Sequence, residues 1–452
     1  MIIGPIVALV FIIVITKLLV KKFNPHATLL IGGLFMLCIA TLMQMPLPEL
    51  KSATGFKGFD LFKFVKESFS EINAGVGLMI MAIGGFVAYM DKIGASDVLV
   101  DLAMKPLALF KKKPYLAASM VIPIGQVLFV AIPSAAGLSL LLMTSLFPIL
   151  TNLGVSRLSA VSVITASTAF GIGPACATTA SAIEIINLDT VFYFLNYQIP
   201  LVLPLSLSMM ITYYFVNSYY DKNNKEEVID NQTIKNKVAV PKIYALLPIL
   251  PIVLLIIFSE FFPIFNPPIK LETTTVMFIS LFVALIFEMI RLKSFKAVLN
   301  SLQTFWDGMG DIFKTVVTLI IAADIFAKGL ISLGFIEGLI EVTQHLGLGA
   351  IGVGIVMTIM IFLASMLMGS GNAAFFAFGP LVPKIALKLG IANTQIILPM
   401  QLAASMGRTV SPVSGVLIAT AQIAQVTPLA ILKRNIIPLT VALVIMLLYH
   451  FI

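Results

Sequence analysis

Residues 362–390 read FLASMLMGSGNAAFFAFGPLVPKIALKLG, and residues 402–424 read LAASMGRTVSPVSGVLIATAQIA. Each stretch is an apolar run with one polar interruption, at 369–372 in the first and at 407–412 in the second. Unpaired backbone is not tolerated in lipid, so such breaks occur only where protein or a water-filled cavity surrounds them. Arg408 in the second break is costly at bilayer depth unless an anionic group meets it. The two stretches predict an anion site near the middle of a membrane protein.

Composition sets the class of protein. The 452 residues are 59% hydrophobic and 11% charged, and the mean hydropathy is +1.06. A soluble chain carries about a quarter charged residues, whereas several runs here reach the ~20 apolar residues that span a bilayer. We therefore expect an all-α polytopic membrane protein. The net charge of +8 does not indicate nucleic acid, because the lysines lie in loops between spans, and the hydropathy excludes a soluble nucleic-acid binder.

The chain offers little for redox, metal or covalent chemistry. Cys38 and Cys176 both fall in apolar runs without a CxxC or Cys/His metal spacing, so we expect no disulfide framework and no firm metal site. Cys176 is predicted to be a small packing residue. The histidines lie far apart near span ends, at His26, His345 and His450. We therefore expect neither an enzyme nor a resident cofactor, and an intramembrane hydrolase lacks its nucleophile and base.

The N-terminal apolar run is followed, not preceded, by lysines. A secretory signal has the reverse order, so we expect a retained first span with an external N-terminus. A polar linker at 220–242 separates an N-terminal repeat, 1–219, from a C-terminal repeat, 243–452. The predicted spans of the first repeat are 3–20, 27–45, 73–90, 158–186 and 191–219, with a hairpin at 115–150. Those of the second are 243–262, 272–290, 312–331, 395–424 and 436–451, with a hairpin at 349–386.

The two halves match each other in register. The landmark pairs lie 236 to 240 positions apart: Leu153-Gly154 with Leu389-Gly390, Ser134 with Ser370, Phe69 with Phe305, Gly94 with Gly334, and Pro174 with Pro412. Each half has five spans and a hairpin, and an odd number of spans inverts the second copy. Two inverted-topology repeats are therefore predicted. Placing both termini in the periplasm and the linker in the cytoplasm leaves most of the 29 basic residues on the cytoplasmic side.

Both hairpins and the spans after them look interrupted at mid-membrane. The arms 115–131 and 138–150 are shorter than the ~30 Å hydrocarbon core requires, so each hairpin should re-enter with its tip near the midplane. The next spans, 158–186 and 395–424, are broken at Pro174 and Pro412. Helices that restart there present free N–H groups to an anion, and unwound carbonyls can hold Na⁺. Four such N-termini converging in two repeats indicate a secondary transporter.

These features also have purely structural interpretations that involve no binding site. A single interrupted span is often a packing kink, although two breaks in register favour a site. Arg408 can be an ion-pair partner instead of a ligand, and the available carboxylates are Glu184, Glu288 and Asp324. Asp324 and Lys328 are spaced i, i+4 and are expected to neutralise each other. An ion channel is the alternative from another functional class.

The order of elements resembles a known family. With GSGNAAFFAF at 369–378 and SMGRTVSPVSG at 405–415, the whole chain is similar to the DcuC family of anaerobic C4-dicarboxylate carriers, part of the ion-transporter superfamily. The resemblance implies uptake, efflux or exchange of succinate, fumarate and malate in a bacterial inner membrane, including succinate efflux in anaerobic metabolism. It also implies a homodimer with a scaffold and a mobile transport domain that works as an elevator, by symport or antiport. A superfamily carrier of another anionic or amino-acid-like substrate is the nearest alternative.

The resemblance also points to side chains. Related dicarboxylate carriers have a Ser-Asn-Thr triplet at each hairpin tip, whereas here Ser134 is followed by two alanines and Gly371 separates Ser370 from Asn372. Neighbouring hydroxyls, Thr168 among them, can compensate. The predicted substrate-binding residues are Ser134, Gly137, Thr178, Thr179, Ser370, Gly371, Asn372, Arg408, Thr409, Ser411 and Ser414. A candidate site for a coupling Na⁺, the alternative being H⁺, comprises Ser134, Gly171, Gly173, Ser370, Asn372 and Gly407.

Overall fold

The computed structural model describes residues 3–110, 112–223, 240–261, 265, 269–345 and 349–451. Within these ranges the chain is helical and contains no strand. Nine of the described helices are long and apolar enough to cross a bilayer. The expectation of an all-α, multi-pass membrane protein is confirmed. Most of the predicted linker, residues 224–239, lies outside the described residues.

The first part of the chain begins with α1 (Ile3–Val20) and α2 (Pro25–Leu42). Then follow α3 (Lys57–Ile72), the π-turn η1 (Asn73–Gly77) and α4 (Leu78–Lys92), with a kink at Gly75, where φ is −96° and ψ is −112°. The predicted span 73–90 corresponds to η1 and α4. The remaining helices to the linker are α5 (Ala95–Met104), η2 (Lys105–Phe110), α6 (Pro114–Ala131), α7 (Ala135–Ser145), α8 (Phe147–Asn152), α9 (Arg157–Ala166), α10 (Ala177–Ile186), α11 (Thr190–Tyr193), η3 (Phe194–Gln198) and α12 (Ile199–Asn223).

The second part of the chain begins after the linker. Its helices are η4 (Lys242–Leu246), α13 (Leu250–Ile257), α14 (Thr273–Leu292), α15 (Phe295–Ser301), α16 (Gln303–Ile312), η5 (Phe313–Val317), α17 (Thr318–Ser332), α18 (Phe335–His345), α19 (Gly349–Met368), α20 (Gly371–Phe378), η6 (Gly379–Leu381), α21 (Val382–Leu389), α22 (Asn393–Thr409), α23 (Gly415–Ala424) and α24 (Pro428–Phe451). The π-turns η1 and η5 begin 240 residues apart. Gly94 and Gly334, also 240 apart, both have positive φ, at 78° and 75°.

Both hairpins return toward the end from which they enter. Tyr115 at the start of α6 and Ser156 just after α8 both hydrogen-bond Asp221. In the second hairpin, Lys388 of α21 forms an ion pair with Glu337 of α18, the helix that precedes α19. The return arm predicted at 138–150 is two helices, α7 and α8, and it begins three residues earlier than expected because Ser134 caps it.

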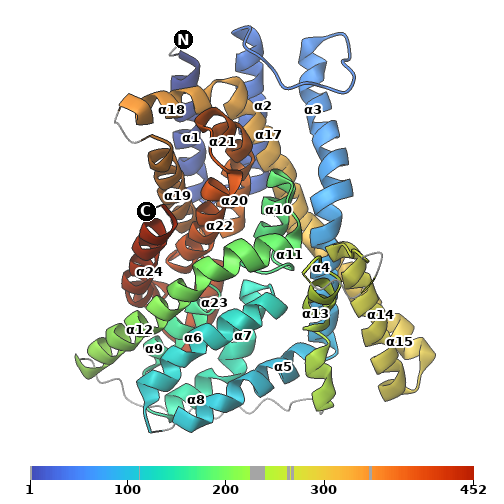
Figure 1. Cartoon of the computed structure of the whole chain (residues 1–452), viewed down its shortest axis with the longest axis vertical. Helices are drawn as coiled ribbons and strands as arrows, with labels where there is room; N and C mark the ends of the chain where they lie inside the picture. The colour runs from blue at the N-terminus through green and yellow to red at the C-terminus, as the bar shows by residue number, and fades with distance from the viewer. Residues whose placement is uncertain are drawn as a thin grey trace.

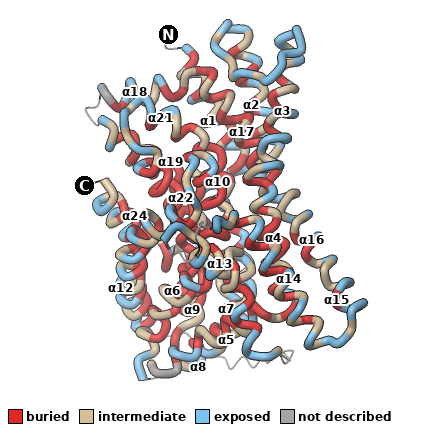
Figure 2. The backbone as a smooth tube through the Cα atoms, turned by 45° about the vertical axis from the view of Figure 1, so that its right-hand side comes forward, coloured by how far each residue is buried: buried red, intermediate tan, exposed pale blue. Residues whose placement is uncertain are grey.

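Helices that are far apart in sequence pack side by side (Figure 1). α17 packs against α2 and α20, α4 against α14 and α16, α12 against α6 and α24, and α22 against α19, α20 and α24. The interrupted helices lie in the buried interior of the molecule (Figure 2). Every residue of α9 from Ser159 to Ala166 is buried, as are nearly all residues of α22. The breaks are therefore surrounded by protein, as unpaired backbone in a membrane requires.

Candidate functional site

Arg408 connects the two breaks. It lies one residue before the end of α22 and is partly buried. Its Nη2 donates a hydrogen bond to the carbonyl oxygen of Thr168 at 2.5 Å and lies 3.5 Å from Thr168 Oγ1. Within the described part of the chain, no carboxylate lies within the 4.0 Å of an ion pair to this guanidinium. The cation is therefore held by a backbone dipole rather than neutralised.

The carboxylates considered as its partners lie elsewhere. Glu288 pairs with Arg291 at 2.7 Å, and Tyr244 donates to the same carboxylate at 2.9 Å. Asp324 pairs with Lys328 at 2.7 Å, which confirms the expected neutral pair. The third carboxylate, Glu184, is exposed near the end of α10.

The two restarting half-helices have open N-termini. The N-cap of α10 is Cys176 and that of α23 is Ser414, and neither side chain accepts a hydrogen bond from its helix. Ser414 is only 1% exposed, yet its hydroxyl has no partner among the described residues. Each helix has ten residues, enough for the partial positive charge of its N-terminus to attract an anion. Pro174 and Pro412 lie within the breaks, two residues before each N-cap.

The return arms of the two hairpins, unlike these half-helices, have N-termini capped by serine side chains. Ser134 accepts a hydrogen bond from the N–H of Gly137 at 3.1 Å, and Ser370 accepts one from Ala373 at 3.2 Å. Both hydroxyls cap their own helices, although each O–H can still donate to another group. Of the four N-termini that were predicted to present free N–H groups, only those of α10 and α23 therefore lack a side-chain cap. Gly137 lies beside Asp91, whose Oδ2 would be 3.9 Å from a Cβ at that glycine.

The second hairpin tip packs directly on the second break. Gly369 has φ of +72°, and a Cβ there would lie 2.9 Å from the carbonyl oxygen of Val413. A Cβ at Gly371 would lie 2.7 Å from the carbonyl oxygen of Ala404. Only glycine allows such a close approach of two backbones. Asn372 lies half-buried at the same tip, so the tip and both ends of the break form one surface.

A buried amide network, which the sequence pattern does not predict, holds the first break. Gln401 Nε2 donates to the carbonyl oxygen of Gly171 at 2.8 Å and to Thr179 Oγ1 at 2.9 Å. Gln198 accepts a hydrogen bond from the N–H of Gly173 at 2.9 Å and donates to Thr179 at 2.9 Å. Both glutamines are fully buried. Uncharged amides in otherwise apolar spans are the available signal, since buried polar side chains in membranes need partners.

The three glycines of the candidate cation site have other partners. Gly171 accepts from Gln401, and its N–H donates to Ser405 Oγ at 3.2 Å. Gly173 adopts φ of +95°, and a Cβ at Gly407 would lie 2.3 Å from the carbonyl oxygen of Phe362. These glycines serve close packing and backbone geometry. No group of three His, Cys, Asp or Glu side chains in the described ranges could hold a metal ion, and carbonyl ligation of Na⁺ stays a prediction.

The remaining predicted ligands divide into two sets. Thr409 Oγ1 donates to the carbonyl oxygen of Ser405 at 2.9 Å, and Ser411 Oγ accepts from the N–H of Val413 at 3.3 Å. Both hydroxyls therefore support their own break. Thr178 Oγ1 lies 3.2 Å from the sulfur of Cys176. A Cβ at Gly171 would lie 3.2 Å from the same sulfur and 2.7 Å from Ser405 Oγ, which places this packing residue at the first break, near α22.

The comparisons with known proteins agree with this architecture. The family model for the C4-dicarboxylate anaerobic carrier, DcuC, matches residues 3–452. The anaerobic C4-dicarboxylate transporter DcuC of Escherichia coli K12 is 33% identical over 445 residues, which cover 98% of this chain and 95% of the relative.

Two solved structures have a similar fold. The YdaH transporter of Alcanivorax borkumensis aligns with a TM-score of 0.65 and 13% identity over 94% of this chain and 97% of that one. MtrF of Neisseria gonorrhoeae, described as illuminating a class of antimetabolite efflux pumps, aligns with a TM-score of 0.59 and 13% identity over 97% of each chain. At this identity the two likenesses concern the fold alone. From the match along its whole length, the chain belongs to the DcuC family of C4-dicarboxylate anaerobic carriers.

Proposed function

We propose that this chain is a secondary active transporter of C4-dicarboxylates in a bacterial inner membrane. One observation carries the proposal: the guanidinium of Arg408 has no carboxylate partner among the described residues and lies beside the first break. A cation at membrane depth without a counter-ion is costly. A carboxylate of the substrate would supply that counter-ion.

A dicarboxylate needs a second positive region. The open N-termini of α10 and α23 provide it, because their first N–H groups are not capped by side chains. Each such terminus contributes about 0.3–2 kcal/mol toward a nearby anion. The Ser370 O–H and the hydroxyl of Ser414 are further donors to the carboxylate oxygens. Charge and donors together favour a small dianion over a neutral or cationic substrate.

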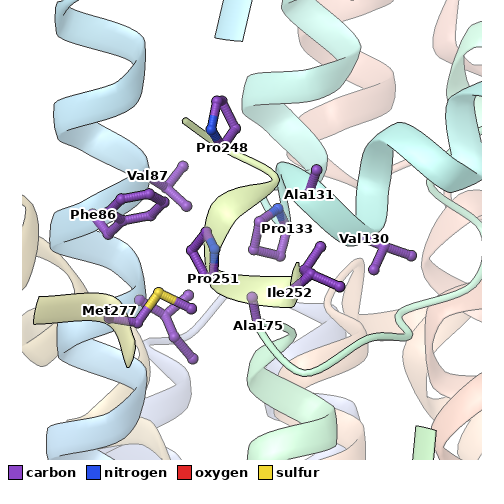
Figure 3. A pocket seen from close by; sticks show the side chains of 11 residues that line it. Phe86, Val87, Val130, Ala131, Pro133, Ala175, Pro248, Pro251, Ile252 and Met277 are labelled. Atoms are coloured by element: carbon purple, nitrogen blue, oxygen red, sulfur yellow. The ribbon is translucent and has the colours of Figure 1, made fainter. Parts of the chain in front are cut away.

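Alternating access would follow an elevator mechanism between two inverted repeats. In support, the π-turns η1 and η5 begin 240 residues apart, α20 of the second hairpin packs against α17, and the first hairpin tip lies against α4 and α13. Pro133 at the first tip faces Phe86 of α4 and Pro251 of α13 across a small apolar cavity of about 10 Å³ (Figure 3). A second, mostly apolar cavity of about 20 Å³ lies where α20 meets α1, α17 and α19. Apolar surfaces of this kind have few directional contacts to resist sliding.

The finer features rest on the family resemblance. A homodimer, periplasmic termini and a cytoplasmic linker remain part of this proposal. Coupling to H⁺ or Na⁺, or replacement of coupling by dicarboxylate exchange, remain alternatives. Uptake and efflux are both compatible with one substrate site, since the direction depends on the gradients.

Counterflow tests the function. Proteoliposomes loaded with unlabelled succinate should accumulate labelled succinate transiently, and external fumarate or malate should compete. Na⁺ and pH are varied independently to identify the coupling ion. Stronger competition by aspartate or aminobenzoyl-glutamate than by succinate would reassign the substrate, and conductance without counterflow would indicate a channel.

A further inference from the structure

One face of α22 contacts the backbone of the first break three times. Gln401, Ser405 and Arg408 are spaced i, i+4, i+7, so they lie on the same side of this helix. Gln401 donates to the carbonyl oxygen of Gly171 at 2.8 Å, and Ser405 accepts from the N–H of Gly171 at 3.2 Å. Arg408 donates to the carbonyl oxygen of Thr168 at 2.5 Å. The helix that carries the cation therefore also binds the unwound backbone opposite it.

Gln401 reaches beyond the break into α10. Its Nε2 also donates to Thr179 Oγ1 at 2.9 Å, in the first turn of that helix. Its Oε1 accepts hydrogen bonds from Tyr193 at 2.9 Å and from Gln198 at 3.3 Å. Nε2 also lies 3.4 Å from Thr178 Oγ1, so two donors and three acceptors fix the orientation of the amide.

We propose that Gln401 is a positioning residue for substrate: it holds the open N-terminus of α10 at a fixed distance from Arg408. The inference deepens the proposed function and rests on it, because it assigns the two carboxylates to these two groups. The break from 167 to 176 contains two glycines and has few hydrogen bonds within its own backbone. We call the hydrogen bonds from Gln401 to Gly171 and Thr179 the amide clamp. Without it, the N–H groups of α10 would no longer be held opposite the guanidinium.

The structure offers a matched pair of variants. Gln401→Leu removes the hydrogen bonds to Gly171 and Thr179 at similar volume. Tyr193→Phe removes only the hydrogen bond to Gln401 Oε1 and leaves the contacts to the break in place. We expect Gln401→Leu to raise the KM for succinate by about tenfold or more, at unchanged amounts of folded protein in the membrane. Tyr193→Phe should stay within about threefold of wild type.

A merely structural role would give a different pattern. It would lower the amount of folded transporter and the maximal rate while leaving KM unchanged, and that result for Gln401→Leu would overturn the inference. If Gln401→Leu is not recovered folded, Gln198→Leu removes the parallel contacts to Gly173 and Thr179. Raised KM in that variant supports the clamp, and unchanged KM opposes it.

Hydrogen–deuterium exchange separates this inference from the proposed function. The amides of Gly173 and Ala180, which donate to Gln198 and to the carbonyl oxygen of Cys176, should exchange faster in detergent-solubilised Gln401→Leu than in wild type, whatever the substrate. Equal exchange rates would overturn the clamp even if succinate is transported. Faster exchange in a protein whose wild type shows no succinate counterflow would leave the clamp in place and reject the proposed substrate.

Discussion

The guanidinium of Arg408 donates a hydrogen bond to the carbonyl oxygen of Thr168 at 2.5 Å, although the two residues are 240 positions apart. The bond uses Nη2, and a guanidinium has five N–H donors in a rigid fork. Arg408 can therefore keep its hold on the first break and still present an edge to a carboxylate. A lysine has a single point charge on a flexible stem, so it would contact either the carbonyl oxygen of Thr168 or the carboxylate rather than both.

Replacing Arg408 tests this double use. Arg408→Ala should lower the apparent affinity for succinate by at least about 2 kcal/mol, roughly thirtyfold, and Arg408→Lys should restore it only in part. The measurement is initial uptake against succinate concentration in vesicles with matched protein levels. Arg157→Gln is the control, because Arg157 lies at the start of the other broken helix and hydrogen-bonds Gln425, at the far end of α23. Near-normal uptake by Arg408→Ala would exclude its role as a ligand.

The tip of the second hairpin should not tolerate a methyl group added at Gly371. In Gly371→Ala the new Cβ would meet the carbonyl oxygen of Ala404 at 2.7 Å, and backbone must move to relieve that contact. We expect a lower melting temperature and a reduced transport rate, with a cost of about 1–3 kcal/mol. Gly415→Ala is the matched control, since a Cβ added at this first residue of α23 would have no neighbouring atom within 4 Å. An equal effect of the two substitutions would contradict the close packing.

Cys176 should report on occupancy of the anion site. Its sulfur lies 3.2 Å from Thr178 Oγ1, and a Cβ at Gly171 would lie 3.2 Å from the sulfur and 2.7 Å from Ser405 Oγ, on the face of α22 that carries Arg408. A negatively charged thiosulfonate reagent should therefore modify it faster than a cationic one of similar size, and succinate should slow the reaction. Mass spectrometry of Cys38→Ser protein measures the labelling without interference from the other cysteine, which is exposed on α2. The charge preference should fall in Arg408→Gln, and a preference that persists there would place the thiol outside the site.

Much of the fold follows from hydropathy alone. The predicted spans 3–20 and 191–219 lie close to the observed helices because long apolar runs leave few alternatives in a bilayer. The prediction misses α3, Lys57–Ile72, since this segment is amphipathic and polar enough to resemble a loop. Helix stability there comes from packing against α17, which composition does not reveal.

The candidate site is predictable where residues break a pattern. Arg408 and the prolines of the breaks stand out in apolar runs and predict a region in which the structure brings both breaks together. Gln401 and Gln198 are not predicted, because an uncharged amide in an apolar run does not reveal which groups it binds. Their role depends on hydrogen-bond partners about 200 positions away. The self-capping of Ser134 and Ser370 is also hidden in the sequence, since it depends on the angle at which each hairpin turns.

The buried ion pair between Asp221 and Arg434 should be the strongest single contact that holds α9, α12 and α24 together. The atoms are 2.7 Å apart, with side chains 5% and 6% exposed. Asp221 also accepts hydrogen bonds from Ser159 at 2.8 Å and Ser156 at 2.9 Å, which ties α12 to α9 and α24. Asp221→Asn leaves the cation buried without its charge partner, at a cost of about 3–5 kcal/mol.

Thermal unfolding in detergent measures this effect. The melting temperature of Asp221→Asn should fall by several degrees, whereas Lys270→Gln, which removes an exposed ion pair with Glu260, should change it little. The double variant Asp221→Leu/Arg434→Met should be more stable than Asp221→Asn, because no unpaired charge remains in the interior. Equal melting temperatures for Asp221→Asn and wild type would show that water reaches this pair, and that α9, α12 and α24 are held together by apolar packing instead.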